Sequence, residues 1–200
     1  AWGKGVNPIN ERVTDIKDSL AFLESYKANK GNVTLGKQVV VVGGGDVAMD
    51  CARAAKRVPG VEEVTIVYRR NIASMPAEKE EIEMAMADGV KFKELLAPVS
   101  YFNKHLTCEV MELGDKDARG RCSVTGSCNM ISLAADAVIG ATGARVQKEF
   151  LKDIELDERG NAKITADNET SVPGVFIAGD CKTGASTIVK AVADGKTVAK

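Results

Sequence analysis

The stretch 39-VVVVGGGDVAMDCARAA-55 decides the fold of this chain. Four consecutive valines are typical of a parallel strand buried on both faces, so we expect a strand over 38–42. Three glycines follow this strand directly, and a helix is predicted from about Asp46 to Arg57, closed by Pro59-Gly60. A strand that breaks into glycines before a helix indicates a turn that holds a phosphate.

The glycine turn fits the pattern G-x-G-x-x-A, with Gly43, Gly44, Gly45, Asp46, Val47 and Ala48. Gly43 permits a tight turn, Gly45 lets the backbone approach a pyrophosphate without a Cβ in the way, and Ala48 keeps the helix close to the strand. Exposed amides and the helix dipole supply positive potential for the phosphates. Asp46 is predicted to be the helix N-cap, and Asp50 an acid aimed away from the ligand. A glycine-rich turn without a ligand is the alternative.

Further segments complete a β-α-β-α-β unit. Strands are expected over 64–68 and 90–95, and helices over 14–31 and 76–89. Thr14 is the predicted N-cap of the first of these helices, Pro76 belongs in the first turn of the second, and Gly89 terminates it. This order of elements predicts a parallel sheet with right-handed crossovers.

The second half of the chain has a different pattern. Short antiparallel strands are expected over 105–113 and 129–134 around the polar loop 114–121, and a further strand over 137–140 ends in Ala141-Thr142-Gly143. The stretch 170-TSVPGVFIAGD-180 is predicted to be a strand that delivers Gly179 and Asp180 to a sheet edge. A helix is predicted over 185–200. The sequence therefore predicts an α/β fold that contains an antiparallel β-meander.

The second predicted strand ends in Tyr68-Arg69-Arg70. In NAD-binding units this position usually carries an acid that bonds the adenosine ribose hydroxyls. An acid would repel a 2′-phosphate, whereas a guanidinium binds it through paired charge-assisted hydrogen bonds. Arg69 and Arg70 therefore predict NADPH rather than NADH as the nucleotide. A solvated pair of arginines at a strand end is the alternative.

Composition limits the partners of the chain. Its 200 residues carry a formal net charge of −1, so no basic field favours nucleic acid or an anionic membrane. Neither a signal peptide nor a bilayer-spanning apolar run is present in the sequence. Five cysteines without a CxxC pair favour reduced thiols, and we expect a cytoplasmic protein. The spacing of Cys122 and Cys128 suggests a metal site, but with His105 as the single histidine we expect no metal.

Several motifs occur together and in one order: the glycine turn, the YRR strand end, the segment Met75–Ala77, the ATG turn, and GD followed by a helix. Nearly the whole chain thereby resembles the flavin-dependent pyridine-nucleotide oxidoreductases, most closely glutamate synthase small subunits and the NADPH/FAD half of dihydropyrimidine dehydrogenase. The resemblance implies a Rossmann-like NADPH-binding domain inserted into an FAD-binding domain. We expect an N-terminal loop and helix over 1–35, the NADPH domain over 36–145, and the C-terminal part of an FAD domain over 146–200.

The resemblance also implies roles for single residues. It assigns Gly43–Ala48 to the pyrophosphate, and Arg69 and Arg70 to the 2′-phosphate. Thr142 and Gly143 form the ATG turn, Asp180 after Gly179 matches the aspartate that bonds the ribityl chain of FAD, and Ser186 and Thr187 lie on the helix that approaches the flavin. The chain has no Ser-His-Asp, Cys-His or paired-carboxylate constellation, so no catalytic acid–base residue is expected.

Two family features have no counterpart in the sequence: a strand–GxGxxG–helix for the ADP half of FAD, and an upstream cysteine-rich iron–sulfur segment. Since the chain begins at Ala1 and stops within a predicted helix, we expect a piece of a longer polypeptide that binds FAD only with the missing segment and is inactive alone. In the intact protein the resemblance implies hydride transfer from NADPH to FAD, and electron transfer to an iron–sulfur or glutamate synthase large subunit-like partner. A stand-alone NADP(H)-binding or sensing module and a methyltransferase are the alternatives.

Overall fold

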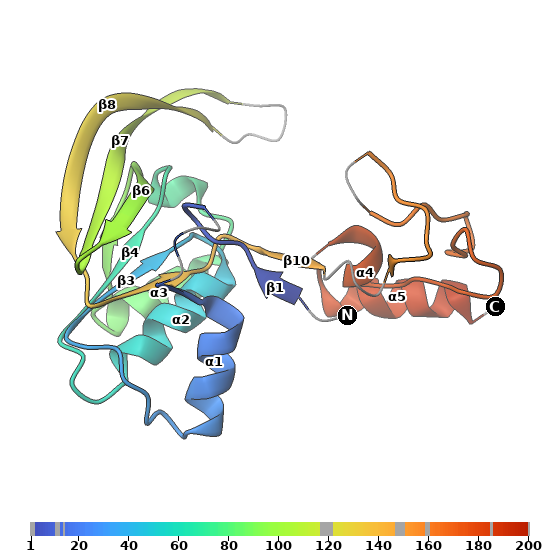
Figure 1. The fold of residues 1–200 in the computed structure, drawn as a ribbon, viewed down its shortest axis with the longest axis horizontal. Helices are drawn as coiled ribbons and strands as arrows, with labels where there is room; N and C mark the ends of the chain where they lie inside the picture. The colour runs from blue at the N-terminus through green and yellow to red at the C-terminus, as the bar shows by residue number, and fades with distance from the viewer. Residues whose placement is uncertain are drawn as a thin grey trace. The chain divides into compact units, whose positions relative to one another are not determined.

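The computed structural model describes residues 3–10, 13, 15–116, 122–146, 151–158, 161–184 and 186–199. The chain divides into two units. One consists of Gly5–Gly143, and the other of Ala144–Lys200 together with the N-terminal residues up to Lys4 (Figure 1). The first unit contains the glycine turn, and the second contains Gly179 and Asp180.

A five-stranded parallel sheet forms the centre of the first unit. Its strands lie in the order β2 (Ile16–Asp18), β9 (Ala137–Gly140), β3 (Gln38–Val42), β4 (Glu63–Val67) and β5 (Lys91–Lys93). All neighbouring pairs are parallel, so the five strands end at one edge, which we call the carboxyl edge. The predicted parallel sheet is confirmed, and β3 lies in its middle.

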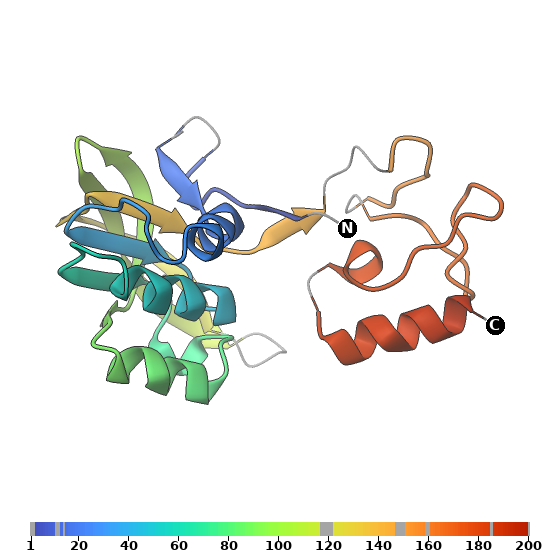
Figure 2. The same cartoon turned by 90° about the horizontal axis from the view of Figure 1, so that it is seen from below.

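The side chains of β3 alternate between two cores, because successive residues of a strand point to opposite faces. Val39 and Val41 pack toward three helices, and Val40 and Val42 pack toward an antiparallel sheet. The helices are α1 (Ser19–Ala28), α2 (Asp46–Lys56) and α3 (Lys79–Ala87). They lie side by side along one face (blue, teal and green in Figure 2). Burial on both faces explains the unbroken run of valines.

The antiparallel sheet covers the second face with β6 (Leu96–Phe102), β7 (His105–Lys116) and β8 (Cys122–Ala134), in this order. The predicted meander is confirmed, but β7 and β8 are longer than the short strands expected, and β6 was not predicted. We did not predict β6 because it contains Pro98, and proline is tolerated in strands only on edge strands and at bulges. Both conditions hold, because β6 is an edge strand and its register shifts between Pro98 and Ser100.

Two predicted helix starts are wrong. Residues 16–18 form β2, and Asp18 rather than Thr14 is the N-cap of α1, since its Oδ1 accepts the N–H of Ala21 at 2.9 Å. Thr14 itself lies outside the described residues. Pairing of β2 with β9 overrides the helical periodicity there. The third helix begins at Lys79 rather than at Pro76, with Glu78 as its N-cap, and the N–H of Ala77 before it donates to the carbonyl of Gly44.

In the second unit β10 (Ala144–Val146) pairs with β1 (Gly3–Gly5), where only a loop was expected. The helices α4 (Asp180–Thr183) and α5 (Ile188–Val198) follow. The strand expected over 170–180 is wrong: the described residues form only isolated bridges there, among them Glu169 with Phe176. A strand needs backbone partners along its length, and in the described residues this segment has only scattered ones, such as the carbonyl of Asn168, which accepts the N–H of Ile177 at 3.0 Å.

Candidate nucleotide-binding site

Three predicted site segments meet at the carboxyl edge of the five-stranded sheet. The glycine turn follows β3, the arginine pair follows β4, and Ala141-Thr142-Gly143 follows β9. Hydrogen bonds join the strand ends, since the N–H of Gly43 donates to Val67 O at 3.1 Å and that of Ala141 donates to Val42 O at 2.8 Å. Ligands of open α/β sheets bind outside this edge.

The three glycines meet different surroundings. A Cβ on Gly43 would lie 2.3 Å from the carbonyl oxygen of Ala141, and the residue has a φ of +150°. A Cβ on Gly44 would lie 2.6 Å from the ring of Tyr68. For Gly45 the nearest atom is Cγ of Pro76, at 4.0 Å. Gly43 and Gly44 are therefore required by packing, whereas a Cβ on Gly45 would make no contact closer than an ordinary van der Waals distance.

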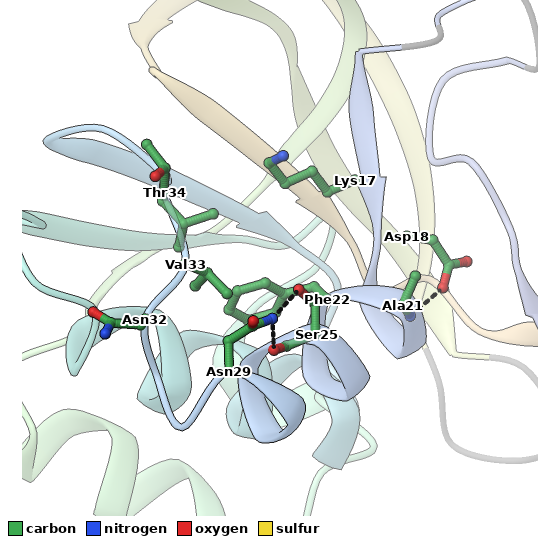
Figure 3. Close-up of a pocket in the computed structure, with 10 residues that line it drawn as sticks. Lys17, Asp18, Ala21, Phe22, Ser25, Asn29, Asn32, Val33 and Thr34 are labelled. Atoms are coloured by element: carbon green, nitrogen blue, oxygen red, sulfur yellow. Dashed lines mark hydrogen bonds between the residues drawn. The ribbon is translucent and has the colours of Figure 1, made fainter.

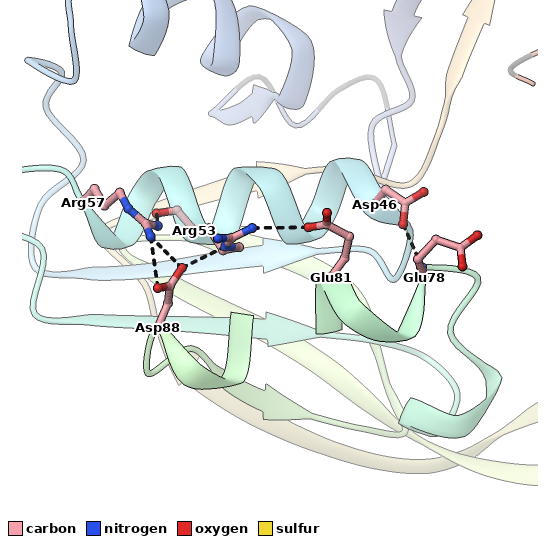
Figure 4. Close-up of polar contacts among 6 residues, drawn as sticks. All are labelled: Asp46, Arg53, Arg57, Glu78, Glu81 and Asp88. Carbon is pink, nitrogen blue, oxygen red and sulfur yellow. Dashed lines mark hydrogen bonds and ion pairs between the residues drawn. The ribbon is translucent and has the colours of Figure 1, made fainter. Parts of the chain in front are cut away.

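The first turn of α2 follows the glycine turn directly. Gly45 is the N-cap, so the prediction of Asp46 as N-cap is wrong. Asp46 is the first helical residue, and its Oδ1 accepts the N–H of Glu78 at 2.9 Å, just before α3 (Figure 4). Val47 is 38% exposed, and Ala48 is fully buried against the sheet. Ala48 thus packs as the motif predicts.

Ion pairs hold α2 against α3 (Figure 4). The Nε of Arg53 lies 2.8 Å and the Nη2 of Arg57 lies 2.9 Å from Oδ2 of Asp88, and Arg53 also reaches Glu81. Hydrogen bonds from Arg53 and then Arg57 lower the pKa of Asp88 below its usual value. The start of α3 is joined to the glycine turn by other contacts, the hydrogen bond of Glu78 to Asp46 and that from the N–H of Ala77 to Gly44 O at 3.1 Å.

Arg69 and Arg70 have different surroundings in the structure. Arg69 is exposed, and no described residue forms a hydrogen bond or ion pair with its side chain. Arg70 is half-buried, and its Nε donates to the carbonyl of Cys122 at the start of β8, at 2.7 Å. Tyr68 packs its ring on Gly44 and donates its hydroxyl to Ser74 O at 3.1 Å. Of the two guanidinium groups, that of Arg69 is the more available to a phosphate, because it forms no hydrogen bond with a described residue.

The turn after β9 is held by a residue that sequence reasoning missed. The hydroxyl of Thr142 donates to the carbonyl of Val6 at 2.9 Å, and the N–H of Val6 donates to Gly143 O at 2.9 Å. Gly143 has a φ of +114°, and a Cβ there would meet no atom within 4 Å. No sequence pattern signals Val6, because it lies 136 residues from Thr142.

The second unit brings the remaining predicted residues to one pocket of about 320 Å³. Gly179, Asp180, Ser186 and Thr187 line it with Ala178, Ile188 and Ala191. Asp180 is exposed, and its Oδ1 accepts the N–H of Ser186 at 3.1 Å. Thr187 is the N-cap of α5.

Behind this pocket lies a pair that the sequence did not reveal. Asp194 is 8% exposed, and its carboxylate accepts the N–H of Gly179 at 3.2 Å and the ammonium of Lys182 at 2.9 Å. The Lys182 contact, followed by the N–H of Gly179, lowers the pKa of Asp194 below its usual value. The pair holds Gly179 at its positive φ of 66°, directly before Asp180.

A separate cavity of about 470 Å³ lies along α1, and none of the predicted site residues lines it (Figure 3). Phe22 and Val33 contribute apolar surface to it, and Lys17 and Asn29 contribute polar groups. Among the described residues, no three His, Cys, Asp or Glu side chains are grouped to hold a metal ion. Within the same ranges, no helix has both the length and the apolar character to cross a bilayer.

Comparisons with known proteins agree with this geometry. Residues 4–195 match the sequence model of the family described as pyridine nucleotide-disulphide oxidoreductase. YgfK of Escherichia coli (strain K12) is 46% identical over 178 residues, which are 87% of this chain and 17% of YgfK. The glutamate synthase (NADPH) small chain of the same strain is 39% identical over 180 residues, which are 82% of this chain and 38% of that protein. The chain thus spans well under half the length of either relative.

Among solved structures, thioredoxin reductase of T. acidophilum matches with a TM-score of 0.71 at 21% identity, over 100% of this chain and 62% of that chain. At this identity the match shows the fold, a Rossmann-like α/β arrangement with an antiparallel sheet. The family match over most of the chain agrees with the resemblance read from the motifs. The chain belongs to the pyridine nucleotide-disulphide oxidoreductase family.

Proposed function

We propose that this chain is the NADPH-binding portion of a flavin-dependent oxidoreductase, similar to the small chain of glutamate synthase. One observation carries the proposal: α2 begins at Gly45, where a Cβ would come no closer than 4.0 Å to any atom, while exposed Arg69 lies at the end of the neighbouring strand. The first feature suits a pyrophosphate and the second a 2′-phosphate. A nucleotide with both phosphates is NADP(H).

The nucleotide would be held by groups that need no rearrangement. The N–H groups of Gly45 and the first turn of α2 would donate to the pyrophosphate, and the tight packing of Gly43 and Gly44 keeps them in position. The fork of Arg69 would take two oxygens of the 2′-phosphate. Thr142 and Gly143, held by Val6, would border the same edge beside β3.

The pocket around Asp180 fits part of an FAD. Its volume of about 320 Å³ suits a fragment of the dinucleotide, and it combines a carboxylate with the start of a helix. Asp180 would accept a hydroxyl of the ribityl chain, and Ser186 and Thr187 would border the flavin. A bound nicotinamide and flavin supply hydride transfer and one-electron transfer, and the protein supplies position and electrostatics. An iron–sulfur protein would be the partner that accepts the electrons.

Isothermal titration of the 200-residue chain with NADPH and NADH tests the nucleotide assignment. We expect wild type to bind NADPH more tightly. Each charge-assisted contact to the 2′-phosphate contributes roughly 1.5–3 kcal/mol, which is about ten- to a hundredfold in affinity at ~1.4 kcal/mol per decade. Arg69→Ala should therefore weaken NADPH by at least about tenfold and leave NADH nearly unchanged. The Arg69→Ala/Arg70→Ala double variant should lose the preference.

Lys37→Ala is the matched control. It removes one positive charge at the opposite edge of the sheet, where β3 begins, from a side chain that is 70% exposed. It should bind both nucleotides like wild type. Added salt should reduce the preference of wild type, since an exposed phosphate site is screened. A double variant that still prefers NADPH as strongly as wild type would overturn the nucleotide assignment.

A further inference from the structure

The paired strands β7 and β8 extend beyond the sheet they belong to. The last β6 pairing is Leu96 with Val110, and residues 111–116 of β7 and 122–126 of β8 continue as a two-stranded hairpin, which we call the arm. Its described side chains are exposed or half-buried, and Leu113 is 40% exposed. An isolated two-stranded hairpin is only marginally stable in water, so the position of the arm depends on the hydrogen bonds that join it to neighbouring residues of the first unit.

Two hydrogen bonds that hold the arm are connected to Arg70, one through Leu95 and one directly. At its base, Met111 donates its N–H to Leu95 O at 2.8 Å, and Leu95 donates its own N–H to Arg70 O at 3.2 Å. At its far end, the carbonyl of Cys122 accepts the Nε of Arg70 at 2.7 Å. Arg70 thus bonds the arm directly at Cys122 and is linked to Met111 only through the backbone of Leu95.

The guanidinium of Arg70 keeps further donors. Nε is its one atom with a hydrogen-bond partner among the described residues, which leaves the N–H groups of Nη1 and Nη2 for a ligand. Neighbouring Arg69 is exposed, and no described residue of the arm forms a hydrogen bond with its side chain. Arg70 therefore connects the end of β4 to the arm through a hydrogen bond, and its sequence neighbour Arg69 does not.

We infer that Arg70 couples binding of the 2′-phosphate to the order of the arm, whereas Arg69 only binds the phosphate. This inference rests on the proposed function. A 2′-phosphate held by the Nη groups fixes the plane of the guanidinium, and the fixed Nε then holds Cys122. Coupling is reciprocal, so an ordered arm also strengthens binding of the phosphate. NADPH stabilises the arm in this way, and NADH does not.

Hydrogen exchange of the full 200-residue chain, without nucleotide and with NADPH or NADH at equal saturation, tests the coupling. Both nucleotides should protect the amides of Gly45–Ala48, and only NADPH should also protect residues 111–116 and 122–126. Without nucleotide, Arg70→Ala should raise exchange in the arm by about tenfold, as expected for a lost hydrogen bond to a charged group. Arg69→Ala should leave that exchange unchanged.

Arg70→Lys separates charge from geometry, because lysine keeps the charge but has no fork to hold two partners at once. It should retain part of the NADPH preference and lose the protection of the arm. Protection of β3 amides in every variant shows that the sheet is folded. Equal protection of the arm by NADPH and NADH, or NADPH protection that survives Arg70→Ala, would refute the coupling. Failure of NADPH to protect even Gly45–Ala48 would instead refute the proposed function.

Discussion

At the scale of single residues, the glycine turn separates what the fold requires from what the proposed ligand requires. Gly43 and Gly44 have no room for a Cβ, because Ala141 and Tyr68 occupy that space. Gly45 has room, and its φ of −96° is open to any residue. The G-x-G pattern therefore contains one glycine, Gly45, that packing does not require and that the proposed ligand would.

Gly45→Ala is predicted to separate binding from stability. The loss in free energy of unfolding should stay within about 1 kcal/mol, the usual cost of alanine at an N-cap. The added methyl group points into the space proposed for the pyrophosphate, so NADPH binding should weaken by about tenfold or more. Urea unfolding and calorimetric titration of the same variant measure the two effects.

Two further glycine variants serve as comparisons for Gly45→Ala. Gly43→Ala should lose at least about 2 kcal/mol of stability, because it combines an unfavourable φ with a clash against backbone. Gly195→Ala, in α5, would meet no atom within 4 Å and should leave NADPH binding unchanged. If Gly45→Ala binds NADPH as well as wild type, the glycine turn does not hold the pyrophosphate.

At the scale of elements, Asp136 joins the connection between β8 and β9 to the start of β3. Its carboxylate accepts the N–H groups of Lys37 and Gln38 at 2.8 and 3.0 Å, and the ammonium of Lys104 at 3.0 Å. The N–H of Gln38, then Lys104 and then the N–H of Lys37 hold the pKa of Asp136 at about 2. The ionised carboxylate thereby stabilises the junction of the two sheets.

Asp136→Asn is predicted to lower stability at neutral pH but not in strong acid. A carboxyl whose pKa is lower in the folded state stabilises the fold above its unfolded pKa of about 3.9. That contribution is lost as the pH falls through the folded pKa of about 2. Urea unfolding at several pH values should show the difference between wild type and variant shrinking between about pH 4 and pH 2.

Asp50→Asn serves as the control, because Asp50 is exposed on α2 and its carboxylate accepts no hydrogen bond from the described residues. Its stability should follow that of wild type at every pH. A constant difference between Asp136→Asn and wild type down to pH 2 would show that the ionised carboxylate contributes nothing specific to the junction.

At the scale of the whole molecule, the two units have unequal cores. The first unit buries residues on both faces of its parallel sheet, and these include Phe22 from α1. Among the described residues of the second unit, the hydrophobic core has three buried members, Leu151, Ala162 and Ile177. A small core rarely outweighs the conformational entropy lost on folding, so the units should differ in independent stability.

A fragment of residues 5–143 is predicted to unfold cooperatively and to keep the NADPH preference of the full chain. A fragment of residues 36–145 lacks β2 and Phe22, and its free energy of unfolding should be lower by at least about 3 kcal/mol, the usual cost of removing a core phenylalanine. Circular dichroism during urea unfolding measures both. Equal stability of the two fragments would show that α1 and β2 are accessory to the NADPH domain.

The sequence by itself determined the family, the α/β fold with its antiparallel meander, and the position of the glycine turn after the central strand. These features follow from short-range properties: a run of valines needs two covered faces, and glycines between a strand and a helix leave few conformations for the turn. The start of α2 was predicted within one residue for the same reason, since Asp46 is the first helical residue rather than the N-cap.

Only the tertiary structure decided the features that depend on distant partners. Residues 16–18 became a strand because β9 pairs with them along their length, and 170–180 did not because the described residues form only isolated bridges with them. Arg70 differs from Arg69 because the carbonyl of Cys122 lies beside it, 52 residues further along the chain. A backbone hydrogen bond forms wherever a donor meets an acceptor, and local sequence does not encode which distant segment supplies that acceptor.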